Sequence, residues 1–117
     1  MTRMQINGSA TGVVRLLALD LPPEAVDRFV TEAGTGEWPL RATLGATRLR
    51  RDFVDVVQIA DLGAMTLSDY LIEAHGVLPA EIAPMRGRID ALDGHVVILP
   101  AQAFGGVTQE IGIAAPL

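Results

Sequence analysis

Two short stretches of the chain, Val13–Leu19 and His95–Leu99, are apolar at almost every position. Neighbouring side chains of a strand point to opposite sides of its sheet, so apolar residues at consecutive positions indicate a strand that is buried on much of both faces. We therefore predict two buried strands, the second of which follows a turn at Asp93-Gly94. The 117 residues are enough for one domain, 1–117, with its own hydrophobic core.

Two helices are predicted from their first and last residues together with their apolar spacing. The start of the first is predicted within Asp20–Glu24, because proline suits the first helical turn, and its end is predicted near Gly34. The second is capped by Thr66 and ends at Gly76. A further helical turn is predicted over 84–92. The residues predicted to face the core are Val26, Phe29, Val30 and Ala33 in the first helix, Leu67, Tyr70, Leu71 and Ala74 in the second, and Met85, Ile89 and Leu92 in the turn.

Three further strands follow from alternating polarity. Trp38–Leu44 and Phe53–Ile59 are predicted to form an antiparallel pair, and a last strand is predicted over Thr108–Ala114. The fold class is therefore α+β, with an antiparallel or mixed sheet and two main helices. The order of elements resembles the split β-α-β arrangement of ferredoxin-like folds with an added C-terminal strand. A small curved barrel that carries helices is the alternative.

Several kinds of chemistry are excluded by residues that the chain lacks. All nine basic residues are arginine, so there is no lysine for a Schiff base or for a phosphate-binding P-loop. There is no cysteine, which excludes thiol catalysis, disulfides and cysteine-ligated metals. The two serines lie outside any G-x-S-x-G motif. We expect no cofactor.

The charge and the hydropathy pattern narrow the choice of partners. A formal net charge of −5 argues against general nucleic-acid binding, which needs a basic face. No apolar stretch approaches the ~20 residues of a membrane-spanning helix. The N-terminal residues do not have the pattern of a signal peptide. We expect a cytoplasmic protein that does not bind nucleic acid or membranes.

The catalytic candidates are His75, His95 and Glu73. Histidine is the side chain best suited to acid-base catalysis near neutral pH, and one of the two lies at a helix end while the other opens a buried strand. The structural alternatives are a charge partner at the helix C-terminus for His75 and a half-buried, hydrogen-bonded side chain for His95. Asp69 and Glu73 share one side of a helix, but two carboxylates alone predict a solvated face, so we expect no metal site.

The ligand-binding candidates are Arg48, Arg50, Arg51 and Trp38. Guanidinium groups bind carboxylates and phosphates in pairs of hydrogen bonds, so the three arginines could hold a small anionic ligand. The alternative is an exposed loop whose charge is balanced by nearby aspartates. Trp38 could stack on a ligand or anchor the core or an interface.

Two classes of function remain open. The first is a small module that works by association, as a homodimer or as an accessory protein bound to another protein. It is favoured by 50% hydrophobic residues, a mean hydropathy of +0.35 and an apolar C-terminus. The alternative is a small-molecule-binding protein or enzyme that uses His75 or His95 with nearby carboxylates and an arginine anion site. The sequence leaves open whether the protein is an enzyme and whether the two histidines meet.

Overall fold

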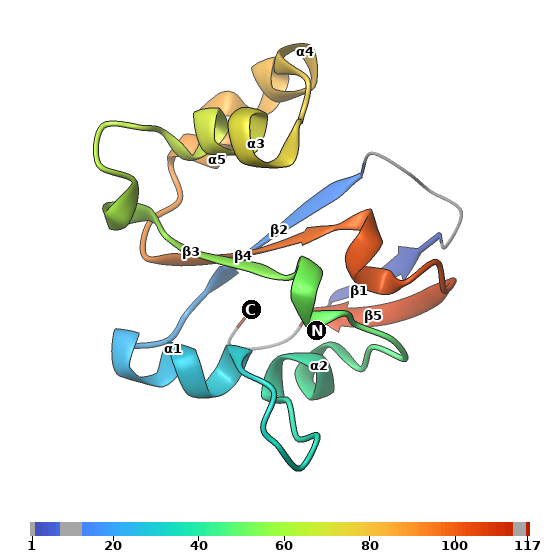
Figure 1. The fold of residues 1–117 in the computed structure, drawn as a ribbon. Coiled ribbons are helices and arrows are strands. Elements are labelled where there is room, and N and C mark those ends of the chain that lie inside the picture. The colour runs from blue at the N-terminus through green and yellow to red at the C-terminus, as the bar shows by residue number, and fades with distance from the viewer. Residues whose placement is uncertain (1, 8–12, 114–116) are drawn as a thin grey trace.

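The computed structural model describes residues 2–7, 13–113 and 117, and within them the chain forms two antiparallel sheets and five α-helices (Figure 1). The strands are β1 (Thr2–Ile6), β2 (Val14–Leu19), β3 (Asp55–Gln58), β4 (His95–Pro100) and β5 (Gln109–Ile113). The α-helices are α1 (Pro23–Val30), α2 (Pro39–Leu44), α3 (Leu67–His75), α4 (Pro79–Ile82) and α5 (Arg86–Asp90). The predicted α+β class is confirmed.

The larger sheet has the strand order β2-β4-β3, and β4 is antiparallel to both of its neighbours. The outer strands β2 and β3 are therefore parallel to each other, with α1 and α2 between them in the sequence and β4 inserted between them in the sheet. This is a split β-α-β arrangement. The C-terminal strand β5 lies in the second sheet, where its partner is β1.

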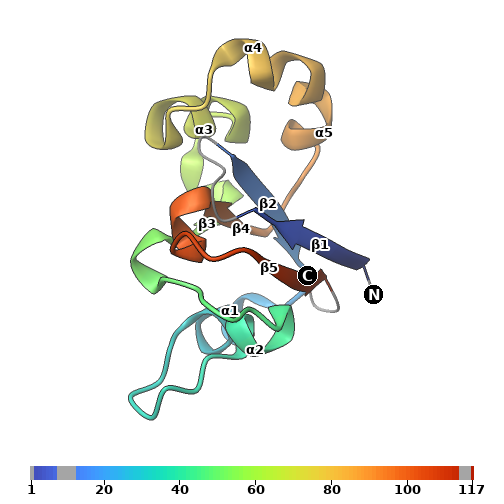
Figure 2. The same cartoon turned by 90° about the vertical axis from the view of Figure 1, so that its right-hand side faces the viewer.

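Both faces of the larger sheet are covered (Figures 1 and 2). Helices α3, α4 and α5 lie on one face, and α1, α2 and the β1–β5 sheet lie on the other. Strand β4 separates the two halves of the core: Val97 and Leu99 pack on the α1–α2 side, and Val96 and Ile98 pack on the α3 side. All four side chains are 0% exposed. Their positions explain why the strand is apolar at consecutive residues.

Residues 39–44 form helix α2, so the strand predicted over 38–44 is wrong. The two buried leucines, Leu40 and Leu44, are four residues apart, a spacing that fits one face of a helix as well as one face of a strand. Pro39 occupies the first helical turn, and Gly45 ends the helix in the left-handed region at φ 65°. The predicted pairing of this segment with the next strand is also wrong, because β3 pairs with β4.

Helix α1 ends at Val30, four residues before the predicted Gly34. The backbone becomes extended at the next residue, and the indole Nε1 of Trp38 donates a hydrogen bond of 2.8 Å to the carbonyl oxygen of Val30. A tertiary contact therefore satisfies one of the carbonyl groups that a helix leaves free at its end. Ala33, which was predicted to face the core, lies beyond the helix and is exposed.

The predicted limits of α3 are confirmed. The Thr66 hydroxyl oxygen accepts a hydrogen bond of 3.1 Å from the Asp69 backbone N–H, and Gly76 ends the helix at φ 66°. The helical turn predicted over 84–92 belongs to a longer helical segment that begins with α4 and ends with α5. Met85 was predicted to face the core in this turn, but its side chain is 47% exposed.

Strand β1 has no counterpart among the predicted elements. It pairs with β5 over its whole length, and the pair buries Ile6 and Ile111 against the core. The strand predicted over 108–114 is β5, although Ala114 lies outside the described residues. Within the described part of the chain, β5 is thus paired in its own subunit.

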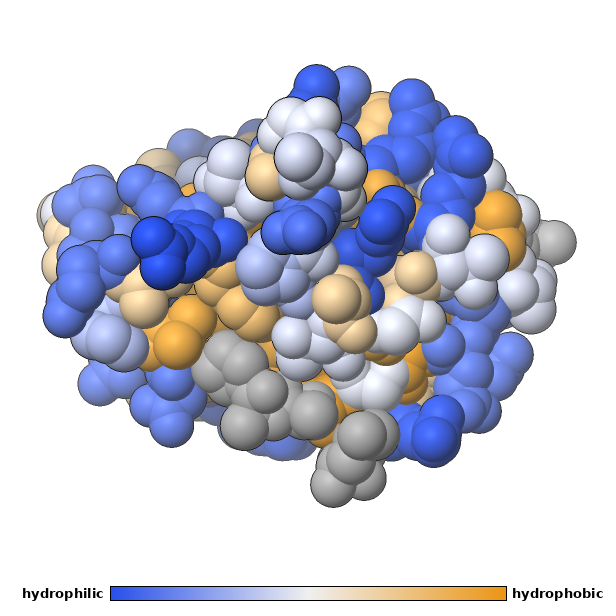
Figure 3. Space-filling model, turned by 90° about the horizontal axis from the view of Figure 1, so that it is seen from below, coloured by the Kyte–Doolittle hydropathy of each residue, from blue (hydrophilic) through white to orange (hydrophobic). Residues whose placement is uncertain are grey.

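Among the described residues, no helix is long and apolar enough to cross a membrane. Seen from the side of α1 and α2, the surface is mainly hydrophilic, with hydrophobic residues in small separate patches (Figure 3). The large hydrophobic side chains that are more than a third exposed are Val13, Phe53, Leu78 and Met85.

Candidate functional site

The candidate site lies where the first residue of β3 meets the last turns of α3. The strand predicted over 53–59 is shorter in the structure, because Phe53 belongs to a 3-10 turn and β3 begins at Asp55. Asp55 and Val57 are two residues apart and share one face of the strand. Val57 packs among the core residues on the α3 side, so Asp55 also faces α3.

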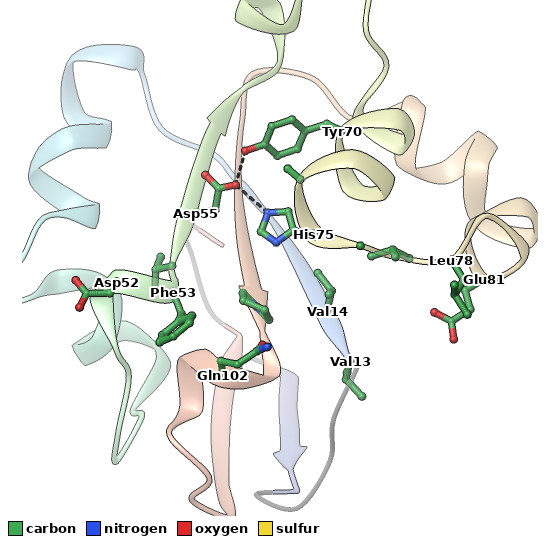
Figure 4. Close-up of a pocket in the computed structure, with 15 residues that line it drawn as sticks. Val13, Val14, Asp52, Phe53, Asp55, Tyr70, His75, Leu78, Glu81 and Gln102 are labelled. Atoms are coloured by element: carbon green, nitrogen blue, oxygen red, sulfur yellow. Dashed lines mark hydrogen bonds and ion pairs between the residues drawn. The ribbon is translucent and has the colours of Figure 1, made fainter.

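Two side chains of α3 bind the same carboxylate oxygen of Asp55 (Figure 4). The Tyr70 hydroxyl donates to Asp55 Oδ2 at 2.5 Å, and His75 Nε2 lies 2.9 Å from the same atom. The two rings also touch each other edge to face, with centroids 5.8 Å apart and an angle of 63° between their planes. Asp55, Tyr70 and His75 therefore form one connected cluster.

The hydrogen bonds determine the protons of the His75 ring. An ionised carboxylate only accepts, so Nε2 carries the proton that is shared with Asp55, and in the neutral ring Nδ1 keeps its lone pair. Nδ1 has no partner among the described residues, and none of their fully buried side-chain nitrogen or oxygen atoms is unpaired, so Nδ1 is accessible to solvent. The His75 side chain is nonetheless only 13% exposed. Its free nitrogen can thus accept a hydrogen bond or a proton from a molecule in the cavity beside it.

Tyr70 keeps its proton at any physiological pH. Its hydrogen bond to Asp55, with smaller effects of burial and of repulsion by the same carboxylate, raises the pKa of Tyr70 from 10.0 to about 12. A neutral phenol continues to donate to Asp55, whereas a phenolate would be repelled by it. Tyr70 is therefore a positioning residue that holds Asp55 in place opposite His75.

The cavity next to this cluster has a volume of about 590 Å³. Its lining mixes polar and aliphatic side chains, and the polar ones lie on several sides of the cavity (Figure 4). The residues that line it are Val13, Val14, Asp52, Phe53, Val54, Asp55, Tyr70, Ala74, His75, Gly76, Val77, Leu78, Glu81, Pro100 and Gln102. Among the described residues, the lining contains no arginine, serine, threonine, cysteine or lysine. These residues can therefore hold a ligand and exchange a proton with it, but they offer none of the usual hydroxyl, thiol or amine nucleophiles.

The structure separates the catalytic candidates of the sequence. His75 lies in the cavity described above, whereas His95 lines another cavity on the α1 face of the sheet, beside Val26 and Asp61. Glu73 is exposed and lines neither of these cavities. Only His75 is thus joined to a carboxylate in a cavity.

The ligand-binding candidates lie elsewhere. Arg48, Arg50 and Arg51 are exposed, and none of them lines the His75 cavity. The Arg50 guanidinium lies over the ring of Phe53, which does line that cavity, at 4.8 Å from the ring centre. Trp38 is 3% exposed, and its ring packs in the core. This position favours the anchoring role of Trp38 over stacking on a ligand.

The partners of His75 were not identified from the sequence. The sequence pattern marks Asp55 only as one of the two aspartates, with Asp52, that balance the charge of the arginine loop, and it marks Tyr70 only as a core residue of its helix. The alternation in the sequence places Asp55 and Val57 on one face of a strand, but it does not indicate which helix this face contacts.

The residues considered for a metal site do not form one. Asp69 lies 3.5 Å from Arg86, and the described residues contain no group of three or more histidine, cysteine or acidic side chains that could hold an ion.

Comparison with known proteins identifies no relative: no protein-family model, no curated protein and no solved structure matches the chain. Function is therefore inferred from the geometry of the site alone. The feature with the clearest chemical consequence is a histidine that a carboxylate orients and that keeps one nitrogen open to a cavity.

Proposed function

We propose that this chain is a small-molecule-binding protein whose ligand occupies the cavity beside Asp55 and His75. The observation that carries the proposal is that the two nitrogens of the His75 ring have different surroundings. Nε2 is bound to Asp55, whereas Nδ1 is accessible to solvent. A histidine held in this way has a fixed tautomer and a fixed direction for its lone pair. Both properties favour recognition of a ligand that donates a hydrogen bond.

The cavity supports the same function by its shape and its composition. Ligand sites are concave and mostly apolar, with a few polar groups that orient the ligand. Here Val14, Val77 and Pro100 supply apolar wall, and the Asp55–His75 pair supplies the oriented polar group. The pair also allows His75 to take a proton from a bound molecule, as a general base does.

The test is a screen of mixed small fragments against the whole chain, followed through the imidazole NMR signals of both histidines. We expect fragments that bind to perturb His75 and to leave His95 unchanged, since His95 lies on the opposite face of the sheet. A His75→Gln variant should lose the binding, and a His95→Gln variant is the matched control that should keep it. A screen in which no fragment perturbs His75 would contradict the proposal.

A second candidate function is self-association. It is favoured by exposed apolar side chains that lie around the His75 cavity or around a neighbouring cavity between β2 and the helices α3 to α5. These side chains are Val13, Phe53, Leu78 and Met85. A two-fold dimer would cover them, and binding to another protein would do the same. Light scattering at increasing protein concentration distinguishes the cases, because a mass that stays near 12.4 kDa would exclude the dimer.

The cytoplasmic location expected from the sequence stays a prediction.

A further inference from the structure

The His75 cavity adjoins a second cavity of about 410 Å³ between β2 and the helices α3 to α5. The two cavities share four wall residues, namely Val13, Val14, Val77 and Glu81. Figure 4 shows Val13, Val14 and Glu81 on the side of the His75 cavity that lies toward α4. The two cavities therefore lie next to each other along these residues.

The second cavity differs from the first in its chemistry. Among the described residues its lining is apolar apart from Glu81, and the side chains that line this cavity and not the first are Leu16, Leu71, Ile82, Met85 and Ile89. None of these described lining residues is aromatic, and none besides Glu81 can be charged. Such a wall fits an aliphatic chain, which gains binding energy from every methylene group that it removes from water.

The charges around the two cavities indicate the polar end of the ligand. The ionisable groups that line them are Asp52, Asp55, Glu81, His75 and the neutral Tyr70, so carboxylates outnumber any positive charge. The chain has nine arginines, and none of them lines either cavity. A carboxylate or phosphate head would be repelled there. An ammonium head would be attracted, and it would also donate a hydrogen bond to His75 Nδ1.

We infer that the ligand is an aliphatic amine that spans both cavities, with its amino group at His75 and its hydrocarbon chain in the cavity between β2 and α5. This inference rests on the proposed function, because it assigns a ligand class to the same site. It predicts a dependence on chain length that comes from the second cavity and a dependence on head-group charge that comes from the first.

The test uses the whole chain and three series of short linear compounds, namely primary amines, alcohols and carboxylates with three to eight carbon atoms. Affinity is measured by calorimetry. For the amines we expect a rise of about three- to fourfold per methylene group until the cavity is full. At equal chain length the amine should bind best and the carboxylate worst. Carboxylates that bind more tightly than amines would overturn the inference, and so would amines whose affinity is independent of length.

Two variants test the two ends separately. Met85→Trp narrows the second cavity at an exposed wall position, so it should remove the chain-length dependence while propylamine binds as before. Its matched control is Ala83→Trp, which adds the same ring to the same 3-10 turn at a residue that lines neither cavity. Asp55→Asn removes the carboxylate that is bound to His75, so it should reduce the preference for amines over alcohols several-fold. An unchanged preference in Asp55→Asn, or an unchanged length dependence in Met85→Trp, would overturn the inference.

Failure of the inference can be told apart from failure of the proposed function. If fragments perturb His75 but the amine series shows no dependence on length or charge, the ligand class is wrong and the binding site stands. If no compound of any class perturbs His75, the binding site itself is wrong. If the chain dimerises and binds no amine, a second copy covers the cavities and the inference is overturned.

Discussion

Alkaline titration of Tyr70 gives the most direct test of the Asp55–Tyr70–His75 cluster. Tyr70 is the single tyrosine, and the chain has no lysine or cysteine, so no other side chain has an ordinary pKa between about 9 and 12. In the folded protein the pKa of Tyr70 is raised to about 12, mainly by its hydrogen bond to Asp55. The ultraviolet absorbance of tyrosinate should therefore appear near pH 12 in the folded protein and near pH 10 in the unfolded chain.

The raised pKa also predicts how stability changes with pH. A phenol whose pKa is higher in the folded state contributes stability that is fully present below pH 10 and is lost as the pH rises through 12. Two pKa units correspond to at most roughly 2.7 kcal/mol. Because Tyr70 is only partly buried and water screens the contact, we expect about 1 kcal/mol. Tyr70→Phe should thus be about 1 kcal/mol less stable than the wild type near pH 8, and equally stable near pH 12.

Urea unfolding followed by fluorescence measures this difference, since Trp38 is the single tryptophan and is buried. Asp55→Asn is the control, because it removes the carboxylate and should return the tyrosine titration toward pH 10. A titration of the folded wild type near pH 10 would refute the hydrogen bond. A stability difference that stays constant from pH 8 to pH 12 would refute the link between that bond and the phenol proton.

Three further predictions concern the fold and the arginines. Phe29→Ala should cost ~3–5 kcal/mol, because Phe29 is 9% exposed in the core, and a loss below about 1 kcal/mol in urea unfolding would mean that α1 presents another face. Gln109→Leu should lower the free energy of unfolding by about 2 kcal/mol, because the buried Gln109 amide makes hydrogen bonds to the backbone of Thr47 and Arg48. An unchanged urea midpoint would show that water satisfies these backbone groups in the variant. Saturating phosphate should raise the Tm of the wild type if the arginine cluster binds anions, and Arg50→Ala should remove the rise; equal Tm values in both proteins would show that the cluster is an ordinary charged loop.

The sequence by itself determined those elements whose signals lie within a few residues of each other. Helix α3 is bounded by its Thr66 cap and by Gly76, and both act through local backbone hydrogen bonds and dihedral angles. Strand β4 was found because a strand buried on both faces must be apolar throughout. The same local signals placed His75 at the end of its helix.

The tertiary structure decided what the local pattern left ambiguous. Leu40 and Leu44 suit a strand or a helix equally, and helix α2 is selected by the packing of both leucines against the same core together with the Gly45 cap. Strand β1 is short and partly polar, so it became a strand only by pairing with β5, which is about a hundred residues away.

The candidate site also depended on the tertiary structure. Asp55 and His75 are 20 residues apart, and they meet because β3 lies at the edge of the sheet, beneath α3. Hydrogen bonds between distant residues depend on strand order and on helix placement, which follow from burying the whole apolar surface at once. The sequence therefore supplied the chemical groups of the site, and the packing of the whole chain brought them together.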